Sequence, residues 1–337
     1  MTEPAQAARP ASLPRRWRRA LQTGNPPPGP VDPVTRWLVL TRAAVLPMTL
    51  TSAAVAGLLA AGRPGFRWPL WLLATLGLVS AHVANNLMND LFDLEAGTDT
   101  ADYPRALYAP HPVLSGLATR GQLVRAALVA NVADLVVLAV LVAARGWAMA
   151  AFALTGFFLS VAYTAPPLRL KKRGLGEPSV LLVWGPLMVG GTYYAAVGQL
   201  PGAVVVASFP YALLCTAVLM GKHIDKLDWD GPRGVRTLPV LLGESASRAV
   251  TRWMMAAFYP LVAGLVVLQA LPVPALLALG GLRRFVLVRR AYLRPRPAEP
   301  PAGFPVWPLW FAPLAFVHAR RAGSLFVAGL AVGALLT

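Results

Sequence analysis

Residues 85–99 read Asn85-Asn86-Leu87-Met88-Asn89-Asp90-Leu91-Phe92-Asp93-Leu94-Glu95-Ala96-Gly97-Thr98-Asp99, and they follow a nearly uncharged run from Pro69 to Met88. That run is long enough for a transmembrane helix, which needs ~20 mostly apolar residues. The carboxylates therefore begin where such a helix would reach the membrane surface. Because Asp90 and Asp93 are three residues apart, they share one face if the helix continues. The stretch predicts an acidic site at the end of a membrane span.

A second acidic stretch follows another apolar run, Ala203 to Gly221, and reads Lys222-His223-Ile224-Asp225-Lys226-Leu227-Asp228-Trp229-Asp230. The chain has 14 acidic residues. Eight of them lie in or just after the two stretches, namely Asp90, Asp93, Glu95, Asp99, Asp102, Asp225, Asp228 and Asp230. Carboxylate oxygens at this density favour a hard divalent cation, and Mg²⁺ binds carboxylates together with substrate phosphates. We expect the two stretches to hold magnesium and a diphosphate between them; solvated loop charges and helix caps are the alternative.

The composition indicates a membrane protein. The 337 residues are 56% apolar and 13% charged, whereas a soluble chain has ~25% charged residues. Several separate runs approach or exceed the length of a membrane span. We therefore expect an all-α, polytopic fold of about nine transmembrane helices around a central cavity. The expected spans are 36–61, 69–92, 121–144, 147–165, 176–198, 202–222, 248–271, 272–290 and 305–336, the last of which could be an interfacial helix followed by a short span.

The net charge of +17 could indicate nucleic acid, but its distribution favours membrane orientation. From a cytoplasmic N-terminus, Arg63, Arg67 and Arg145 fall in outside loops, and most other loop cations fall inside. This predicts a multi-pass protein of the cell membrane, with both acidic stretches facing the cytoplasm, a lipid bilayer as partner and no nucleic acid. The single cysteine, Cys215, excludes an intramolecular disulfide and a cysteine-based metal site.

Two parts of the chain differ in composition. Residues 1–34 are basic and proline-rich, with too little apolar surface to fold alone, so a disordered cytoplasmic tail is expected. Its cluster of Arg15, Arg16, Arg18 and Arg19 could instead form a short helix on anionic lipid. Residues 35–337 form the predicted transmembrane domain.

Basic and aromatic residues complete the predicted site. A diphosphate needs positive charge beyond the metal, and guanidinium or ammonium groups can provide it. The candidates are Arg169, Lys171, Lys222, Arg233 and Arg236, although basic loops are common in membrane proteins. Tyr163, Tyr193 and Tyr194 are candidates to line the cavity and stabilise a carbocation, with ordinary packing as the alternative. Asp134, inside a predicted span, is either functional or a buried hydrogen-bond partner.

Together these residues resemble the UbiA superfamily of intramembrane prenyltransferases over about residues 36–335. The first acidic motif, Asn89-Asp90-x-x-Asp93 followed by Asp99, is similar to that of the dihydroxynaphthoate prenyltransferases of menaquinone synthesis. Three further stretches add to the resemblance: Tyr163 to Lys171, Gly174 to Glu177 with Gly190 to Tyr194, and Arg236 to Gly243. One departure is that the second motif lacks the usual aspartates four residues apart. Asp230 aligns best with the last of these, and either Asp225 or Asp228 could be the other ligand.

The resemblance implies a prenyltransferase that moves an isoprenoid chain from an allylic diphosphate to an aromatic acceptor. It implies two magnesium ions, bound among Asp90, Asp93, Asp99, Asp225, Asp228 and Asp230. The catalytic residues expected on this basis are Asn89, Asp90, Asp93, Asp228 and Asp230. A terpene cyclase and a transferase with a non-quinone acceptor are the alternatives within the superfamily. A cation or phosphate transporter is the alternative outside it, which would place ionisable groups near the middle of spans.

Overall fold

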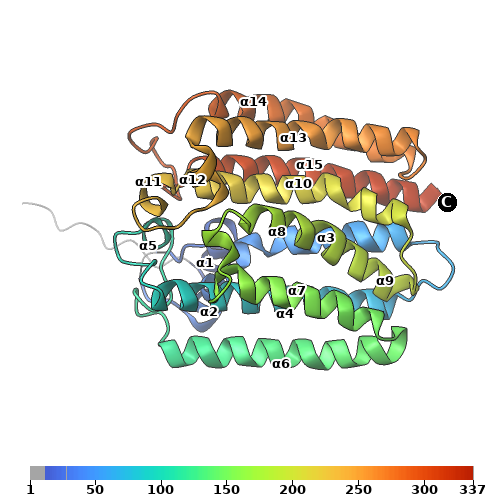
Figure 1. The fold of residues 1–337 in the computed structure, drawn as a ribbon, viewed down its shortest axis with the longest axis horizontal. Helices are drawn as coiled ribbons and strands as arrows, with labels where there is room; N and C mark the ends of the chain where they lie inside the picture. The colour runs from blue at the N-terminus through green and yellow to red at the C-terminus, as the bar shows by residue number, and fades with distance from the viewer. Residues whose placement is uncertain (1–11, 28, 337) are drawn as a thin grey trace, which may run out of the picture.

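Long apolar helices run side by side, and the short helices α1, α5, α11 and α12 gather at one end of the bundle (Figure 1). The computed structural model describes residues 12–27 and 29–336. Its long helices are α3 (Leu46–Ala60), α4 (Trp68–Glu95), α6 (Arg120–Arg145), α7 (Ala148–Thr164), α10 (Gly202–Ile224), α13 (Glu244–Val267) and α15 (Phe311–Leu336). A further long helix consists of α8 (Gly176–Leu182), a π-helical stretch (Val183–Gly190) and α9 (Gly191–Val197).

The expected all-α membrane fold is confirmed. Within residues 12–27 and 29–336, seven helices are long and apolar enough to cross a membrane. α7 is a shorter apolar helix. The ninth expected span, 272–290, corresponds to a 3₁₀ segment (Val273–Gly281) followed by α14 (Leu282–Tyr292). Each expected span therefore has a helical counterpart, but those at 147–165 and 272–290 are not among these seven helices.

The first and last expected spans differ in detail from the prediction. The span 36–61 is broken at Arg42, whose φ of +53° separates α2 (Pro33–Leu40) from the helix that follows. The break turns the Arg42 side chain toward Asp90. The last span is one continuous helix rather than an interfacial helix and a short span. Its polar His318 is fully buried and lies 2.8 Å from the Tyr259 hydroxyl, so it does not interrupt the helix.

Part of the expected tail is folded. Residues 1–11 lie outside the described residues, but α1 (Leu13–Thr23) is a helix that packs on α2. Trp17 donates a hydrogen bond to Asp32 at 3.0 Å, and Asn25 donates to the carbonyl of Tyr108 at 2.9 Å. These two anchors explain why a segment with little apolar surface of its own is ordered here.

The core centres on α10, which packs against α8, α13 and α15, while α4 packs mainly against α6. A helix cap fixes where α6 begins. Thr119 and Gln122 form a reciprocal capping box at the start of α6. The loops after α4 and after α10 both emerge at the end of the bundle that carries α5 (Pro104–Tyr108), α11 (Leu227–Asp230) and α12 (Leu238–Leu242) (Figure 1). The two acidic stretches are thus brought to the same end.

Candidate active site

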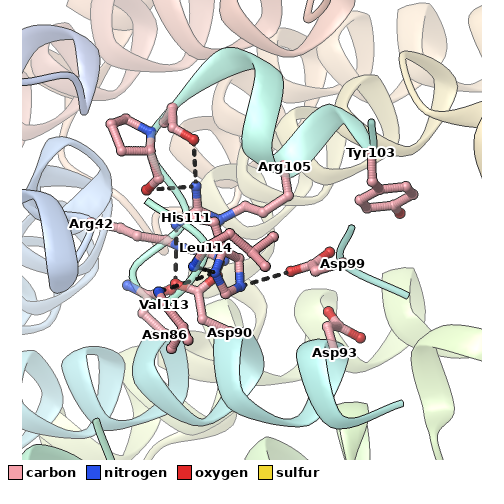
Figure 2. Close-up of polar contacts among 12 residues, drawn as sticks. Arg42, Asn86, Asp90, Asp93, Asp99, Tyr103, Arg105, His111, Val113 and Leu114 are labelled. Atoms are coloured by element: carbon pink, nitrogen blue, oxygen red, sulfur yellow. Dashed lines mark hydrogen bonds and ion pairs between the residues drawn. The ribbon is translucent and has the colours of Figure 1, made fainter. Parts of the chain in front are cut away.

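The first acidic stretch forms a tight turn at the end of α4. Gly97 has a φ of +65°, a conformation that favours glycine. The backbone amides of Thr98 and Asp99 then both donate to the carbonyl of Asp93, at 2.9 and 3.1 Å. The chain therefore folds back so that the buried carboxyl groups of Asp93 and Asp99 lie near each other (Figure 2).

Asp90 is held between two guanidinium groups. Arg105 makes a bidentate contact, with Nε 2.8 Å from one carboxylate oxygen and Nη2 3.1 Å from the other. Arg42 donates a third hydrogen bond to the same carboxylate. Asp90 is fully buried, and its charge is compensated by these two cations (Figure 2). Paired in this way, Asp90 orients Arg42 and Arg105 toward the pocket.

Asp99 has a histidine partner. His111 Nε2 lies 3.5 Å from the Asp99 carboxylate. Burial would raise the pKa of Asp99, but the nearby His111 ring and the charges of Lys226 and Lys171 together hold it below its usual value. Ligand atoms of Asp90, Asp99 and His111 all lie within 4.8 Å of one another, which is close enough for one metal ion. Because the Asp90 carboxylate already pairs with two arginines, Asp99 is the carboxylate of this group that is more available to bind a metal ion.

Lysines from two segments border the acidic groups. Lys171 Nζ is 2.5 Å from Asp93, and Lys172 Nζ is 2.7 Å from the Thr98 hydroxyl. Burial would lower the pKa of Lys171, but Asp93 outweighs it and the pKa is raised, so this lysine stays cationic. On the other side, Lys226 Nζ is 3.1 Å from the hydroxyl of Tyr103, which itself donates to Asp230.

Two adjoining cavities meet at this cluster of acidic groups and the basic side chains that border them. A small polar cavity of about 10 Å³ is lined by Asp93, Asp99 and several cations. An apolar cavity of about 740 Å³ extends from it between the helices. The residues that line both are Arg42, Asn89, Arg105, Tyr163 and Lys222. A ligand with a charged head and a long apolar tail fits this arrangement.

The chemistry of the donor set suits magnesium. Asn89 Oδ1 is buried and has no hydrogen-bond partner among the described residues. With the carboxylates of Asp93 and Asp99 it borders the small polar cavity. A buried amide oxygen without a partner carries a desolvation penalty, which an ion would remove. Three oxygen donors around a cavity of this size fit one hard cation with remaining positions for water or phosphate.

A polar stripe continues down α4 into the apolar cavity. Asn85, one turn below Asn89, accepts a hydrogen bond from Ser160 at 2.9 Å. His82, about one turn deeper, has its Nδ1 2.7 Å from the Thr49 hydroxyl. Its ring packs edge-on against Trp184, with centroids 5.3 Å apart. Both His82 and Asn85 line the cavity.

The three aspartates of the second acidic stretch have different surroundings. Both oxygens of Asp225 accept backbone hydrogen bonds, from Phe311 at 2.9 Å and Ala312 at 2.8 Å, so this residue caps the start of α15. The side chain of Asp228 is 77% exposed and pairs with Arg296 at 3.4 Å. Asp230, by contrast, is buried against Tyr103. The structure therefore brings Asp230 to the cluster but not Asp228.

Most of the other candidates lie away from the two cavities, and Asp134 is the exception. Arg233 pairs with the exposed Asp102 at 2.9 Å and lies over the Tyr103 ring. Tyr193 is buried in the core, and Tyr194 donates to the carbonyl of Arg145 at 3.1 Å. Three more placements are notable: Arg169 has a φ of +45°, Arg236 is exposed, and Asp134 lines the apolar cavity beside Asn131.

Sequence reasoning missed five residues of the cluster: Arg42, Tyr103, Arg105, His111 and Lys226. All five come from loops or helix ends, where spacing says little about contact. The Glu177 carboxylate also lies 2.6 Å from His223, and this buried pair abuts the polar cavity. The one sequence feature that could have identified any of these residues was the occurrence of Lys226 and His223 among the aspartates of the second stretch.

Comparison with known proteins identifies the family. Residues 50–312 match the UbiA prenyltransferase family. The chain is 28% identical to the 1,4-dihydroxy-2-naphthoate octaprenyltransferase of Escherichia coli over 63% of this chain and 70% of that protein. It is 25% identical to the 2-carboxy-1,4-naphthoquinone phytyltransferase of Synechocystis sp., over 74% and 80%. It is 32% identical to the digeranylgeranylglyceryl phosphate synthase of Natronomonas pharaonis, over 62% and 66%.

Solved structures show the same fold. A UbiA homolog from Aeropyrum pernix, solved in its apo form, superposes with a TM-score of 0.64 at 20% identity, covering 85% of this chain and 96% of that one. A homolog from Archaeoglobus fulgidus, bound to GPP and Mg²⁺, gives 0.50 at 15% identity, covering 88% and 99%. With the match to the family over most of its length, the chain belongs to the UbiA prenyltransferase family and is a membrane prenyltransferase.

Proposed function

We propose that the enzyme transfers a prenyl chain from an allylic diphosphate to an aromatic acceptor of the dihydroxynaphthoate type, as in menaquinone synthesis. The observation that carries this proposal is the junction of a cation-rich polar pocket with an apolar cavity of about 740 Å³. The diphosphate head lies at the junction, near Asn89 and Lys222, and the isoprenoid tail extends along the apolar walls. Burial of the tail provides affinity in proportion to its apolar area.

Magnesium is the proposed cofactor, with Asn89 Oδ1, Asp93 and Asp99 as its protein ligands. When bound, the ion neutralises charge on the departing diphosphate. Asp90 acts through Arg42 and Arg105, which it orients toward the same head group. Asp225 and Asp228 are not part of the proposed ligand set, because one caps α15 and the other is exposed.

In the proposed reaction the bond between C1 of the prenyl chain and the diphosphate oxygen breaks first. Lys171, Lys222 and Arg105 stabilise the negative charge that grows on the diphosphate. The allylic cation remains in the apolar cavity, where water is excluded and the rings of Tyr163 and Trp184 can stabilise it. The electron-rich ring carbon of the acceptor then bonds to C1. If that carbon carries a carboxylate, carbon dioxide leaves it, and if it carries hydrogen, the proton passes to the released diphosphate.

The polar stripe on α4 supports an aromatic acceptor. Asn85 and His82 lie one and about two turns below Asn89, or roughly 6 and 10 Å along the helix axis. They therefore lie just beyond the reacting C1, with hydrogen-bonding groups set in an otherwise apolar wall. The hydroxyl and carboxyl groups of a dihydroxynaphthoate ring match such a wall. The relatives from E. coli and Synechocystis are named for acceptors of this kind.

A second acceptor class has one observation in its favour. The relative from N. pharaonis is named as a digeranylgeranylglyceryl phosphate synthase, and its identity of 32% is higher than that of the E. coli naphthoate enzyme, 28%. A glyceryl phosphate would need additional cations in the acceptor wall. The described residues His82, Asn85 and Ser160 provide neutral hydrogen-bonding groups instead, which favours the aromatic acceptor.

The active site is proposed to face the cytoplasm of the cell. The two acidic stretches and α1 lie at one end of the bundle (Figure 1), and the loops at that end carry most of the loop cations, including Arg169, Lys171 and Arg233. Because loop cations are in excess on the cytoplasmic side of membrane proteins, this distribution supports the proposed orientation.

The test is turnover by the purified enzyme in lipid nanodiscs. A prenyl diphosphate is supplied with 1,4-dihydroxy-2-naphthoate, 4-hydroxybenzoate or a glyceryl phosphate, and products are identified by mass spectrometry. We expect prenylated naphthoate, loss of turnover on chelation and recovery with Mg²⁺. Asp93→Asn should lower turnover roughly 100-fold, the scale of one lost electrostatic stabiliser, while the matched exposed variant Asp102→Asn should stay near wild type. Prenylation of the glyceryl phosphate alone, or full turnover after chelation, would contradict the proposal.

A further inference from the structure

We infer that this enzyme holds the diphosphate with one magnesium ion and the ammonium groups of Lys222 and Lys226, which take the place of a second metal ion. The inference rests on the proposed prenyl transfer and concerns the same site. The resemblance of the sequence to the superfamily implied two ions, one for each acidic stretch. The geometry of the second stretch provides ammonium groups where a second set of carboxylates was expected.

The second stretch offers a single carboxylate to the pocket. Both oxygens of Asp225 are bound to the backbone amides at the start of α15, and Asp228 faces solvent beside Arg296. Asp230 remains, and it accepts a hydrogen bond from Tyr103. A single carboxylate that already accepts a hydrogen bond is at the lower limit for Mg²⁺, which proteins bind through one or two carboxylates together with phosphate.

Lys226 occupies the position opposite Asp230. Its side chain is buried, and its ammonium lies 3.1 Å from the Tyr103 hydroxyl and 4.3 Å from the centre of that ring. The Tyr103 hydroxyl therefore contacts Lys226 on one side and Asp230 on the other. An ion at this place would lie next to a buried ammonium group, and like charges repel strongly where water is scarce.

Lys222 lies at the junction of the two cavities. Within residues 12–27 and 29–336 its ammonium group makes no hydrogen bond or ion pair. It is four residues before Lys226, near the end of α10, where the diphosphate head is proposed to lie. A lysine without a protein partner at this junction is free to bind an anion from the substrate, and the charge of that anion favours the ammonium form of the side chain.

The positions of the lysines in the chain also support ammonium groups in place of a second ion. Of its 31 lysine and arginine residues only four are lysines, and these are Lys171, Lys172, Lys222 and Lys226. The first two contact Asp93 and Thr98, and the other two line the polar cavity. Lysine provides a compact ammonium charge with three donors, unlike the planar fork of arginine. The small polar cavity, about 10 Å³, has room for about one ion or water molecule.

The test counts metal ions without using turnover. Mn²⁺ is titrated into the purified enzyme in the presence of a non-reactive prenyl thiodiphosphate, and bound Mn²⁺ is counted by electron paramagnetic resonance. We expect one ion per chain in the wild type and two in Lys226→Asp, because a carboxylate at position 226 would face Asp230. Arg294→Asp, an exposed charge reversal in the segment just after α14, is the matched control and should keep one ion.

Two further variants keep the inference testable if Lys226→Asp does not fold. Lys222→Met and Lys226→Met should each weaken binding of the thiodiphosphate roughly 10- to 100-fold, the scale of one charged hydrogen bond, and both should still bind one Mn²⁺. Two ions in the wild type would overturn the inference and leave the prenyl transfer intact. Failure of the folded wild type to bind the thiodiphosphate at all would refute the proposed function and the inference together.

Discussion

A substitution at Asp90 tests whether this residue orients neighbouring side chains or binds the metal ion. The Asp90→Asn variant keeps the side-chain shape but removes the negative charge between Arg42 and Arg105. Both guanidiniums face this carboxylate, and the side chain of Asp90 is fully buried. The change leaves two cations close together without their shared counter-ion.

The expected loss of stability follows from this geometry. Removing one partner of a buried ion pair costs about 3–5 kcal/mol, because the remaining charge is uncompensated. For a chain of 337 residues that corresponds to a fall of about 4–7 °C in apparent melting temperature. Adding Arg42→Gln removes one of the two repelling cations, and we expect it to recover about 0.5–3 kcal/mol as a coupling energy.

The assay uses the single cysteine of the chain. Cys215 is 2% exposed in α10, so a thiol-reactive fluorophore too large to enter the apolar cavity that this residue lines labels it when the bundle opens. The signal gives the melting temperature in detergent. The magnesium concentration for half-maximal turnover is measured in parallel. Asp90→Asn should melt early with its magnesium requirement unchanged, whereas Asp93→Asn should show a raised magnesium requirement and a smaller change in melting. Wild-type melting of Asp90→Asn, together with a raised magnesium requirement, would show that Asp90 is a ligand and refute this reasoning.

Three further predictions concern residues around the site. Burial raises the pKa of Asp225 from 3.8 to about 7 despite its backbone hydrogen bonds, so the folded protein retains a proton that the unfolded chain releases. Its stability should therefore fall by up to about 4 kcal/mol as pH rises from about 4 to about 8, and thermal melts of Asp225→Asn should lose this slope. In a Cys215→Ala background, Ala96→Cys and Pro232→Cys should react with an impermeant thiol reagent only from the cytoplasmic side of membrane vesicles; labelling from the opposite side would reverse the orientation. Asp228→Asn should retain turnover within a few-fold of wild type in the nanodisc assay, because its side chain faces solvent, and a roughly 100-fold loss would place it in the site.

The membrane fold followed from local sequence because apolar runs must be helical where water is absent to satisfy the backbone. Their lengths gave the approximate bounds of the spans, and the structure differs mainly where a backbone turn depends on a distant contact. The left-handed conformation of Arg42, which breaks the first expected span, accompanies its contact with Asp90. No pattern within residues 36–61 could have revealed a partner at position 90.

The division of work among the carboxylates was decided by tertiary structure. Composition and spacing located the two acidic stretches and indicated the cation-dependent chemistry they favour, because carboxylates at the ends of apolar spans can be recognised from the sequence alone. Whether Asp225, Asp228 or Asp230 faces the pocket depends on the start of α15, on Arg296 and on Tyr103, which are far away in the sequence. The role of a charged side chain is set by which opposite charges and amides surround it after folding, and those neighbours come from separate helices.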